Sequence, residues 1–124
     1  MNKKIKQTVI SDECKKGLLV INDTLELLSG KWKIKIIALL LKGGKFNFME
    51  LLREADGIGS KMLSKDLQEL EVNHLLTRTV KSTKPITVEY ELTTHGKSLS
   101  KVIDEIENWG ALHRKIILTA INES

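Results

Sequence analysis

The sequence predicts a mainly helical fold with a small β-hairpin, an α+β architecture, and three observations support it. Apolar residues recur at three-and-four spacing in four segments before residue 74 and in one long C-terminal segment, as in amphipathic helices. Between them lie two short segments rich in Thr, Val, Tyr and Leu, separated by a turn-like stretch. Only 4% of the residues are aromatic, so we expect an aliphatic core of Leu, Ile and Val.

Length and composition indicate one globular domain. A chain of 124 residues has room for a single core. Hydrophobic residues make up 41% and charged residues 29%, which excludes a disordered chain. The polar, basic start of the chain predicts a flexible arm over residues 1–13, followed by one domain over residues 14–124.

The formal net charge of +4 favours a polyanionic partner such as nucleic acid. The longest apolar run, residues 36–41, is far shorter than the roughly 20 residues that span a bilayer, so we expect no membrane partner. The charged N-terminus does not resemble a signal peptide, and the single cysteine excludes an internal disulfide. These features predict a cytoplasmic protein, associated with the nucleoid if it binds DNA.

The first two helices are predicted from their apolar spacing and from glycines. Leu18, Ile21, Leu25 and Leu28 define the first helix, and Gly30 is a plausible C-terminal cap. The second helix is expected over about residues 31–41, and a pair of glycines at 43–44 ends it.

The next two helices are predicted from capping signals. Asn47 and Glu50 have capping-box spacing, so a third helix is expected from about Asn47 to about residue 55. A tight turn follows at residues 56–59. Gly59 or Ser60 then caps a fourth helix, expected over about residues 61–73.

Strands at about residues 76–80 and 87–92 form the predicted hairpin, with a tip at residues 81–85. Thr93 or Thr94 caps a final long helix whose apolar positions are Leu99, Val102, Ile106, Trp109, Leu112, Ile116 and Ala120. Helices joined by a tight glycine turn and followed by a two-stranded ribbon form a winged helix-turn-helix.

The fourth helix carries the predicted contacts to DNA. Its leucines 63, 67 and 70 share one face, which we expect to be buried. Lysine neutralises phosphate, and Gln, Ser or Lys side chains reach base edges in the major groove. The candidate contacts on this helix are Ser60, Lys61, Ser64, Lys65 and Gln68. The alternative is an ordinary solvated helix face with its usual charges. The helix-turn-helix and the following wing favour contact with DNA instead.

The hairpin adds a second set of basic residues. Arg78, Lys81 and Lys84 are the candidate contacts of the wing, since a basic tip beside such a helix reaches flanking phosphates or the minor groove. The alternative is a loop whose lysines only keep it soluble.

Several strings resemble one known family when taken together and in order. They are S-G-K-W-K at 29–33, G-G-K-F-N-F-M-E-L at 43–51, G-I-G-S-K-M-L-S-K-D-L-Q-E-L-E at 57–71, V-E-Y-E-L-T-T-H-G at 88–96 and W-G at 109–110. The chain thus resembles the HxlR-type winged helix-turn-helix transcription regulators, a bacterial family related to the MarR group. The resemblance covers about residues 14–110.

This resemblance implies a homodimer that binds a palindromic operator in double-stranded DNA and dimerises through its first and last helices. The apolar stripe of the last helix agrees independently, because it is longer than one small domain needs to bury. The expected dimerisation residues are Leu18, Ile21, Leu25, Ile106, Trp109, Leu112 and Ile116.

The chain departs from the family pattern at three positions. Lys15 stands where proline usually follows the cysteine, Gln68 where the recognition helix usually has Arg, and His74 where a glycine is common. The change at Gln68 weakens any transfer of base contacts from relatives.

Cys14 is a candidate redox sensor, as in some family members. Its neighbours Lys15 and Lys16 favour the thiolate, whereas Asp12 and Glu13 oppose it. The alternative is an inert thiol at a helix start.

The remaining classes of function are not supported by the sequence. No cofactor or metal is expected, because the three histidines lack ligand partners at zinc spacing, and no enzyme motif is present. A small-molecule effector stays unknown. The alternative to a DNA reader is a winged helix that binds a protein partner.

Overall fold

The chain divides into two compact units, Met1–Gly30 and Lys31–Ser124, and each is described by itself. The computed structural model describes residues 11–123. Most of the predicted basic arm, residues 1–10, therefore lies outside the described residues.

The first unit contains helix α2 (Asp12–Leu27). Its N-cap is Ser11, whose hydroxyl accepts a hydrogen bond of 3.2 Å from the backbone N–H of Cys14. Two acidic residues in the first turn, Asp12 and Glu13, interact favourably with the helix dipole. The helix therefore starts before its first apolar residue, which is why apolar spacing alone placed its start near Leu18.

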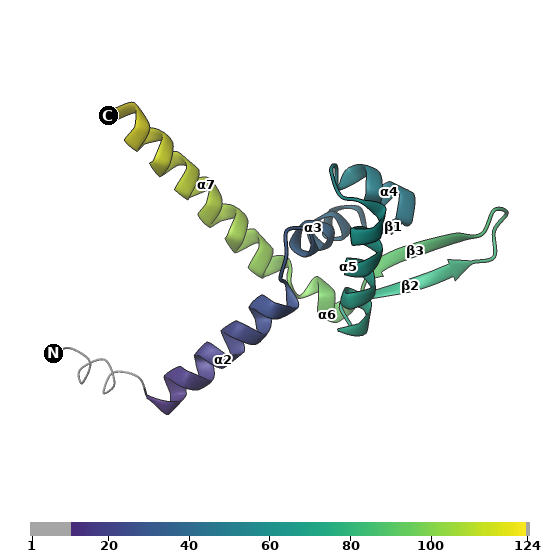
Figure 1. Ribbon diagram of the computed structural model, residues 1–124, viewed down its shortest axis with the longest axis horizontal. Coiled ribbons are helices and arrows are strands. Elements are labelled where there is room, and N and C mark those ends of the chain that lie inside the picture. Colours follow the sequence, from purple (N-terminus) through teal and green to yellow (C-terminus); the bar gives the residue numbers. More distant parts are fainter. Residues whose placement is uncertain (1–10, 124) are drawn as a thin grey trace. The chain divides into compact units, whose positions relative to one another are not determined.

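The second unit is a winged helix-turn-helix, which confirms the predicted fold class (Figure 1). Its elements are α3 (Lys33–Gly43), β1 (Lys45–Asn47), α4 (Phe48–Glu54), α5 (Ser60–Val72), β2 (Leu76–Lys81), β3 (Thr87–Leu92), α6 (Thr94–Lys97) and α7 (Ser100–Glu123). Figure 1 shows the β2–β3 ribbon projecting beyond helices α3–α5, with its connecting loop at the far end.

The sheet has three antiparallel strands in the order β1-β3-β2. Tyr90 on β3 pairs with Phe46 of β1 on one side and with Arg78 of β2 on the other. Strand β1 was not predicted from the sequence. It ties the start of α4 to the base of the hairpin.

An aliphatic core holds the second unit together, as the composition predicted. It is contributed by α3, α4, α5 and the sheet, and the hairpin contributes Tyr90 as its aromatic member. The most deeply buried side chains are Ile36, Ile37, Leu40, Leu51, Leu63, Leu67, Leu70, Leu75 and Leu76. Burial of each such side chain is worth roughly 1.5–3 kcal/mol.

The capping box of α4 is present as predicted. The Asn47 side chain accepts a hydrogen bond from the backbone N–H of Glu50, and the Glu50 carboxylate accepts one from the backbone N–H of Asn47, both at 2.8 Å. The turn to α5 then uses Gly57 at a φ of 104°, and Gly59 is the N-cap of α5.

Helix α5 ends in a Schellman motif centred on His74. The backbone N–H of His74 bonds the carbonyl of Glu71, and that of Leu75 bonds the carbonyl of Leu70, both at 3.0 Å. His74 has a φ of 62°, in the left-handed region that favours glycine. This geometry explains why a glycine is common at this position in the family that the chain resembles.

The C-terminal helix differs from the prediction in one detail. Thr93 is an N-cap, but of the short helix α6, and the chain then bends at Ser98 before α7 begins. Within α6, Gly96 lies so close to the carbonyl of Leu75 that a Cβ atom would collide with it. This contact joins α6 to the segment that connects α5 with the wing.

Candidate nucleic-acid interface

One face of α5 is free of core contacts and is rich in hydrogen-bonding groups. Leucines 63, 67 and 70 are buried, as predicted. The exposed residues include all five candidate contacts of this helix, namely Ser60, Lys61, Ser64, Lys65 and Gln68. The geometry thus presents two lysines, two hydroxyls and one amide on an accessible helix surface.

The acidic residues on one flank of α5 are held against α3. Glu69 forms an ion pair with the buried Lys33, and Asp66 is itself only 7% exposed. The hydrogen bond from Lys33 lowers the pKa of Glu69, whereas desolvation raises the pKa of Asp66 against the opposing attraction of Lys33. As a result these carboxylates face α3, and the two lysines of α5 stay in solvent.

The opposite flank of α5 meets the base of the wing. Ser64, Gln68 and Glu71 line a pocket together with Arg78 of β2 and Tyr90 of β3. All five side chains carry polar groups, with the Arg78 guanidinium among them. The arrangement brings the predicted helix and wing residues together at one place.

Sequence reasoning missed Glu71 as a member of this pocket. The signal was present, because Ser64, Gln68 and Glu71 have the spacing of one helix face. A carboxylate beside Gln68 accepts hydrogen bonds from amino groups, such as that of cytosine, and repels phosphate.

The two lysines of the wing differ in their surroundings. Lys81 pairs with Glu89 across the hairpin, at 3.2 Å between Nζ and Oε1. Lys84 is exposed in the loop, where the Thr83 hydroxyl bonds the carbonyl of Pro85 at 2.8 Å. This hydrogen bond holds the backbone of the tip. Lys84 forms no ion pair within residues 11–123.

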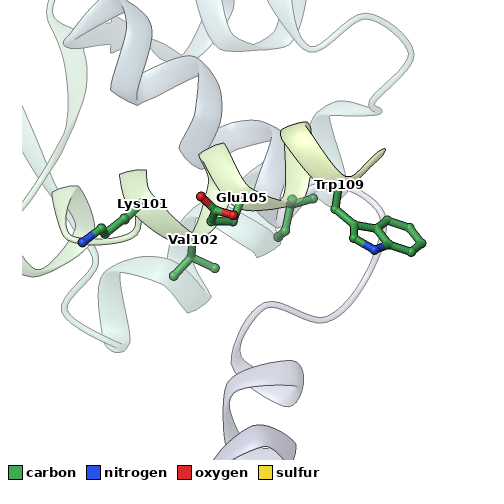
Figure 2. A pocket seen from close by; sticks show the side chains of 5 residues that line it. Lys101, Val102, Glu105 and Trp109 are labelled. Carbon is green, nitrogen blue, oxygen red and sulfur yellow. The ribbon is translucent and has the colours of Figure 1, made fainter. Parts of the chain in front are cut away.

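Helix α7 exposes an apolar surface along its length. None of its 24 residues is buried. Figure 2 shows a pocket on its first half that is lined by Lys101, Val102, Glu105, Ile106 and Trp109. The Trp109 ring stacks on that of His113, with 4.9 Å between ring centroids.

The seven predicted dimerisation residues are all exposed. The exposed fractions of Leu18, Ile21, Leu25, Ile106, Trp109, Leu112 and Ile116 range from 48% to 65%. In both units they lie on helices without a buried residue.

Cys14 lies exposed in the first turn of α2. Hydrogen bonds from Ser11 lower the pKa of its thiol. The sequence pointed to Lys15 and Lys16 for this effect, but the structure assigns it to the N-cap residue. At 100° per residue, Cys14 shares a helix face with Leu18, Ile21 and Leu25.

The described part of the chain lacks both a metal-binding cluster and a membrane-spanning helix. Residues 11–123 contain no group of three His, Cys, Asp or Glu side chains placed to hold a metal ion. Among the same residues, no helix is long and apolar enough to cross a membrane.

A recognition helix beside a β-ribbon defines the chain as a winged helix-turn-helix protein of the DNA-binding type. Residues 27–116 match the model of the HxlR-like helix-turn-helix family, and the chain belongs to that family. The family and its relatives are transcriptional regulators rather than enzymes, as the sequence predicted.

Individual relatives agree with this assignment. The chain is 41% identical over 101 residues to the uncharacterized HTH-type transcriptional regulator YtcD of Bacillus subtilis, covering 82% of this chain and 79% of that protein. It is similar to the redox regulator HypR in its reduced form, with 31% identity, a TM-score of 0.73, and coverage of 80% of this chain and 97% of that one.

A similar structure also links the chain to the MarR group. A MarR-family regulator from Porphyromonas gingivalis W83 has 29% identity and a TM-score of 0.68, with coverage of 82% of this chain and 93% of the other.

Proposed function

We propose that this protein is a homodimeric transcriptional regulator that binds a palindromic operator in double-stranded DNA through α5 and the β2–β3 wing. The observation that carries the proposal is the pocket in which Ser64 and Gln68 of α5 meet Arg78 of the wing. A helix of this kind enters the major groove with its N-terminal residues toward the base edges.

The contacts divide into two kinds. Lys61 and Lys65 suit phosphate oxygens, and Arg78, Lys81 and Lys84 extend the same role along the wing. Ser64 and Gln68 suit base edges, since Gln pairs bidentately with adenine. The phosphate contacts would supply affinity, and the base-edge contacts would supply sequence preference.

A second copy of the chain is the occupant that we propose for the exposed apolar faces of α2 and α7. Large hydrophobic side chains cover both helices, and an exposed apolar surface of this extent marks an interaction site. A twofold dimer presents two α5 helices, and two half-sites in a palindromic operator match that symmetry.

The proposal is tested by DNA binding of purified protein to a duplex selected from a random-sequence pool, measured by fluorescence polarisation. We expect Lys61→Ala and Lys65→Ala each to weaken binding about tenfold or more while the dimer stays intact. Gln68→Ala should instead relax the preference for the selected duplex over an unrelated one, by about 1–3 kcal/mol for each base pair that it reads.

Glu107→Gln provides a control, because Glu107 is exposed on the side of α7 opposite Ile106 and Trp109, and its DNA affinity should match that of the wild type. Wild-type affinity in both lysine variants would show that α5 does not face DNA. A wild-type protein without salt-dependent DNA binding would leave a protein-binding winged helix as the function.

We further propose that Cys14 makes the regulator sensitive to oxidants. Two observations support this: the Ser11 hydrogen bonds lower the pKa of the exposed thiol, and Cys14 shares a face with apolar residues assigned to the dimer. The solved relative HypR is itself described as a redox regulator. Oxidation of two thiols from paired subunits by diamide would give one disulfide and reduce one diamide molecule.

A non-reducing gel after diamide treatment measures this response. We expect a covalent dimer and a changed operator affinity in the wild type, and neither in Cys14→Ser. Unchanged mobility together with unchanged affinity in the wild type would contradict the proposal.

A further inference from the structure

Two lysines converge on one tryptophan beside the turn that leads into α5. The Nζ atoms of Lys31 and Lys35 lie 5.1 Å and 4.6 Å from the centroid of the Trp32 ring. We call these three residues the Trp32 cluster. Both lysines are exposed, whereas Trp32 is half-buried.

The Trp32 cluster is fixed to the helix-turn-helix by the tryptophan. The edge of its ring lies against Gly57, at 3.4 Å from the position that a Cβ atom would take there. Gly57 is in the turn three residues before Ser60, where α5 begins. The ring therefore holds two ammonium groups beside the N-terminal end of the recognition helix.

Neither Lys31 nor Lys35 forms an ion pair in the described part of the chain. Its ion pairs join Lys33 to Glu69, Arg53 to Glu54 and Lys81 to Glu89. Lys35 lines a groove with Lys42, Glu54 and Asp56, but no carboxylate lies within ion-pair distance of it in residues 11–123. Two neighbouring cations on an aromatic face favour an anion as a third partner.

The start of α3, which carries the Trp32 cluster, packs on the side of α5 that the wing leaves open. Ser64 and Asp66, two residues apart, project about 200° apart from a helix. Ser64 faces the wing pocket, whereas the flank of Asp66 and Glu69 faces Lys33, the residue after Trp32. The start of α3, where Trp32 is the N-cap, thus packs on the flank of the recognition helix opposite the wing pocket.

A major groove about 12 Å wide is bordered by one phosphate backbone on each side. A helix in the groove meets one backbone on each flank. The wing, with Arg78, takes the first backbone in the proposed function. We infer that Lys31 and Lys35, held by Trp32, bind phosphates of the second backbone. This inference rests on the proposed function, since it requires α5 to lie in the groove.

These contacts would position the protein without reading sequence. Each neutralised phosphate contributes about 0.9 to the slope of log K against log salt concentration. The Trp32 cluster therefore has a signature that a base-reading residue lacks, because its loss lowers the salt slope and leaves the ranking of DNA sequences unchanged.

The test compares the double variant Lys31→Gln/Lys35→Gln with Lys42→Gln. Lys42 is a matched control because it is exposed on the same helix and lines the same groove as Lys35, about two turns further along. The probe is a duplex recovered by the wild-type protein from a random-sequence pool. Affinity is measured over a salt series, and ethylation interference identifies the phosphates contacted.

We expect the double variant to bind about tenfold more weakly or worse and to lose about 1.8 from the salt slope per protomer. Phosphate ethylation on one side of the groove should stop interfering, and the ranking of mismatched duplexes should be unchanged. Lys42→Gln should behave as the wild type. Because both lysines are exposed, circular dichroism and thermal melting should be unaltered.

Two outcomes would overturn the inference, and they are distinguishable. If Lys61→Ala weakens binding while the double variant matches Lys42→Gln, the Trp32 cluster does not contact DNA and the proposed function stands. If the wild-type protein itself shows no salt-dependent binding to any duplex, the proposed function fails and the inference fails with it.

Discussion

At the scale of single residues, His74 is the clearest strained position. A non-glycine residue in the left-handed region costs about 1–2 kcal/mol, and His74 has a φ of 62°. Its side chain is exposed. We expect His74→Gly to stabilise the protein by about 0.5–1 kcal/mol, because relief of strain exceeds the added entropy of the unfolded chain. Urea denaturation measures the change.

His74→Ala is the matched control for this substitution. Alanine removes the imidazole but keeps a Cβ atom, so it should give little or none of the gain. Equal stabilisation by alanine and glycine would show that the imidazole, not the backbone, is unfavourable there.

Asp66 adds a pH dependence to stability. Desolvation raises the pKa of its carboxyl group, although Lys33 opposes this. The folded protein then binds the proton more tightly than the unfolded chain. The contribution of Asp66 is therefore favourable below its unfolded pKa of about 3.9 and is lost as pH rises through the raised value.

We therefore expect Asp66→Asn to stabilise the protein at pH 7, by up to about 1 kcal/mol. The difference from the wild type should shrink toward pH 4. Urea midpoints at both pH values measure it. Glu69→Gln should behave in the opposite sense, destabilising at pH 7, because Lys33 lowers the pKa of Glu69 and that benefit is lost on acidification. If Asp66→Asn raised the stability equally at both pH values, the carboxyl group of Asp66 would not be the source of the pH dependence.

Helical spacing predicted which residue types line the exposed face of α5, because a single helix fixes that face. It did not predict the partners of those residues. The ion pair between Lys81 and Glu89 depends on the register of two strands, and the position of Glu71 depends on where the wing meets α5. The spacing of Glu71 shows the helix face that it shares with Ser64 and Gln68, but its place beside the wing depends on packing between elements, which leaves no local pattern.

At the scale of elements, the capping box of α4 offers a direct test. Asn47 satisfies one backbone N–H of α4 and also ends β1, so it joins the sheet to the helix-turn-helix. We expect Asn47→Ala to cost about 1 kcal/mol of folding stability, as measured by thermal or urea unfolding. Asn47→Asp keeps the acceptor oxygen and should retain most of the stability. Loss of stability in both variants would point to the strand pairing instead.

The elements that were predicted correctly depend on residues close together in the sequence. The elements that were missed depend on contacts between residues far apart in the sequence. Asn47 and Glu50 are local signals, and the start of α4 was predicted correctly. Strand β1 has three residues, too few for an alternating pattern, and exists through pairing with β3 about 45 residues later in the chain. The bend between α6 and α7 contains no glycine or proline, so nothing local marked it.

At the scale of the whole molecule, most of the exposed large apolar side chains lie on α2 and α7, outside the elements that form the core. The core of the second unit is complete, with leucines and isoleucines below 2% exposure. Helices α2 and α7 nevertheless carry large hydrophobic side chains in solvent. A monomer would gain nothing from this pattern, and burial of about 800 Å² per partner is typical of a stable interface. The distribution supports the proposed dimer.

The proposed dimer predicts that a single charge on the apolar face of α7 prevents dimerisation. Ile106 lines the same surface of α7 as Val102 and Trp109, and Ile106→Glu would bury an unpaired carboxylate in the proposed interface. Sedimentation equilibrium should give twice the chain mass of 14.0 kDa for the wild type and the chain mass itself for this variant. Operator affinity should fall at least about 100-fold, because the second half-site is no longer bound by a linked subunit. Ala111→Glu places the same charge on the opposite side of α7 and should stay dimeric. An unchanged mass for Ile106→Glu would exclude this face as the interface.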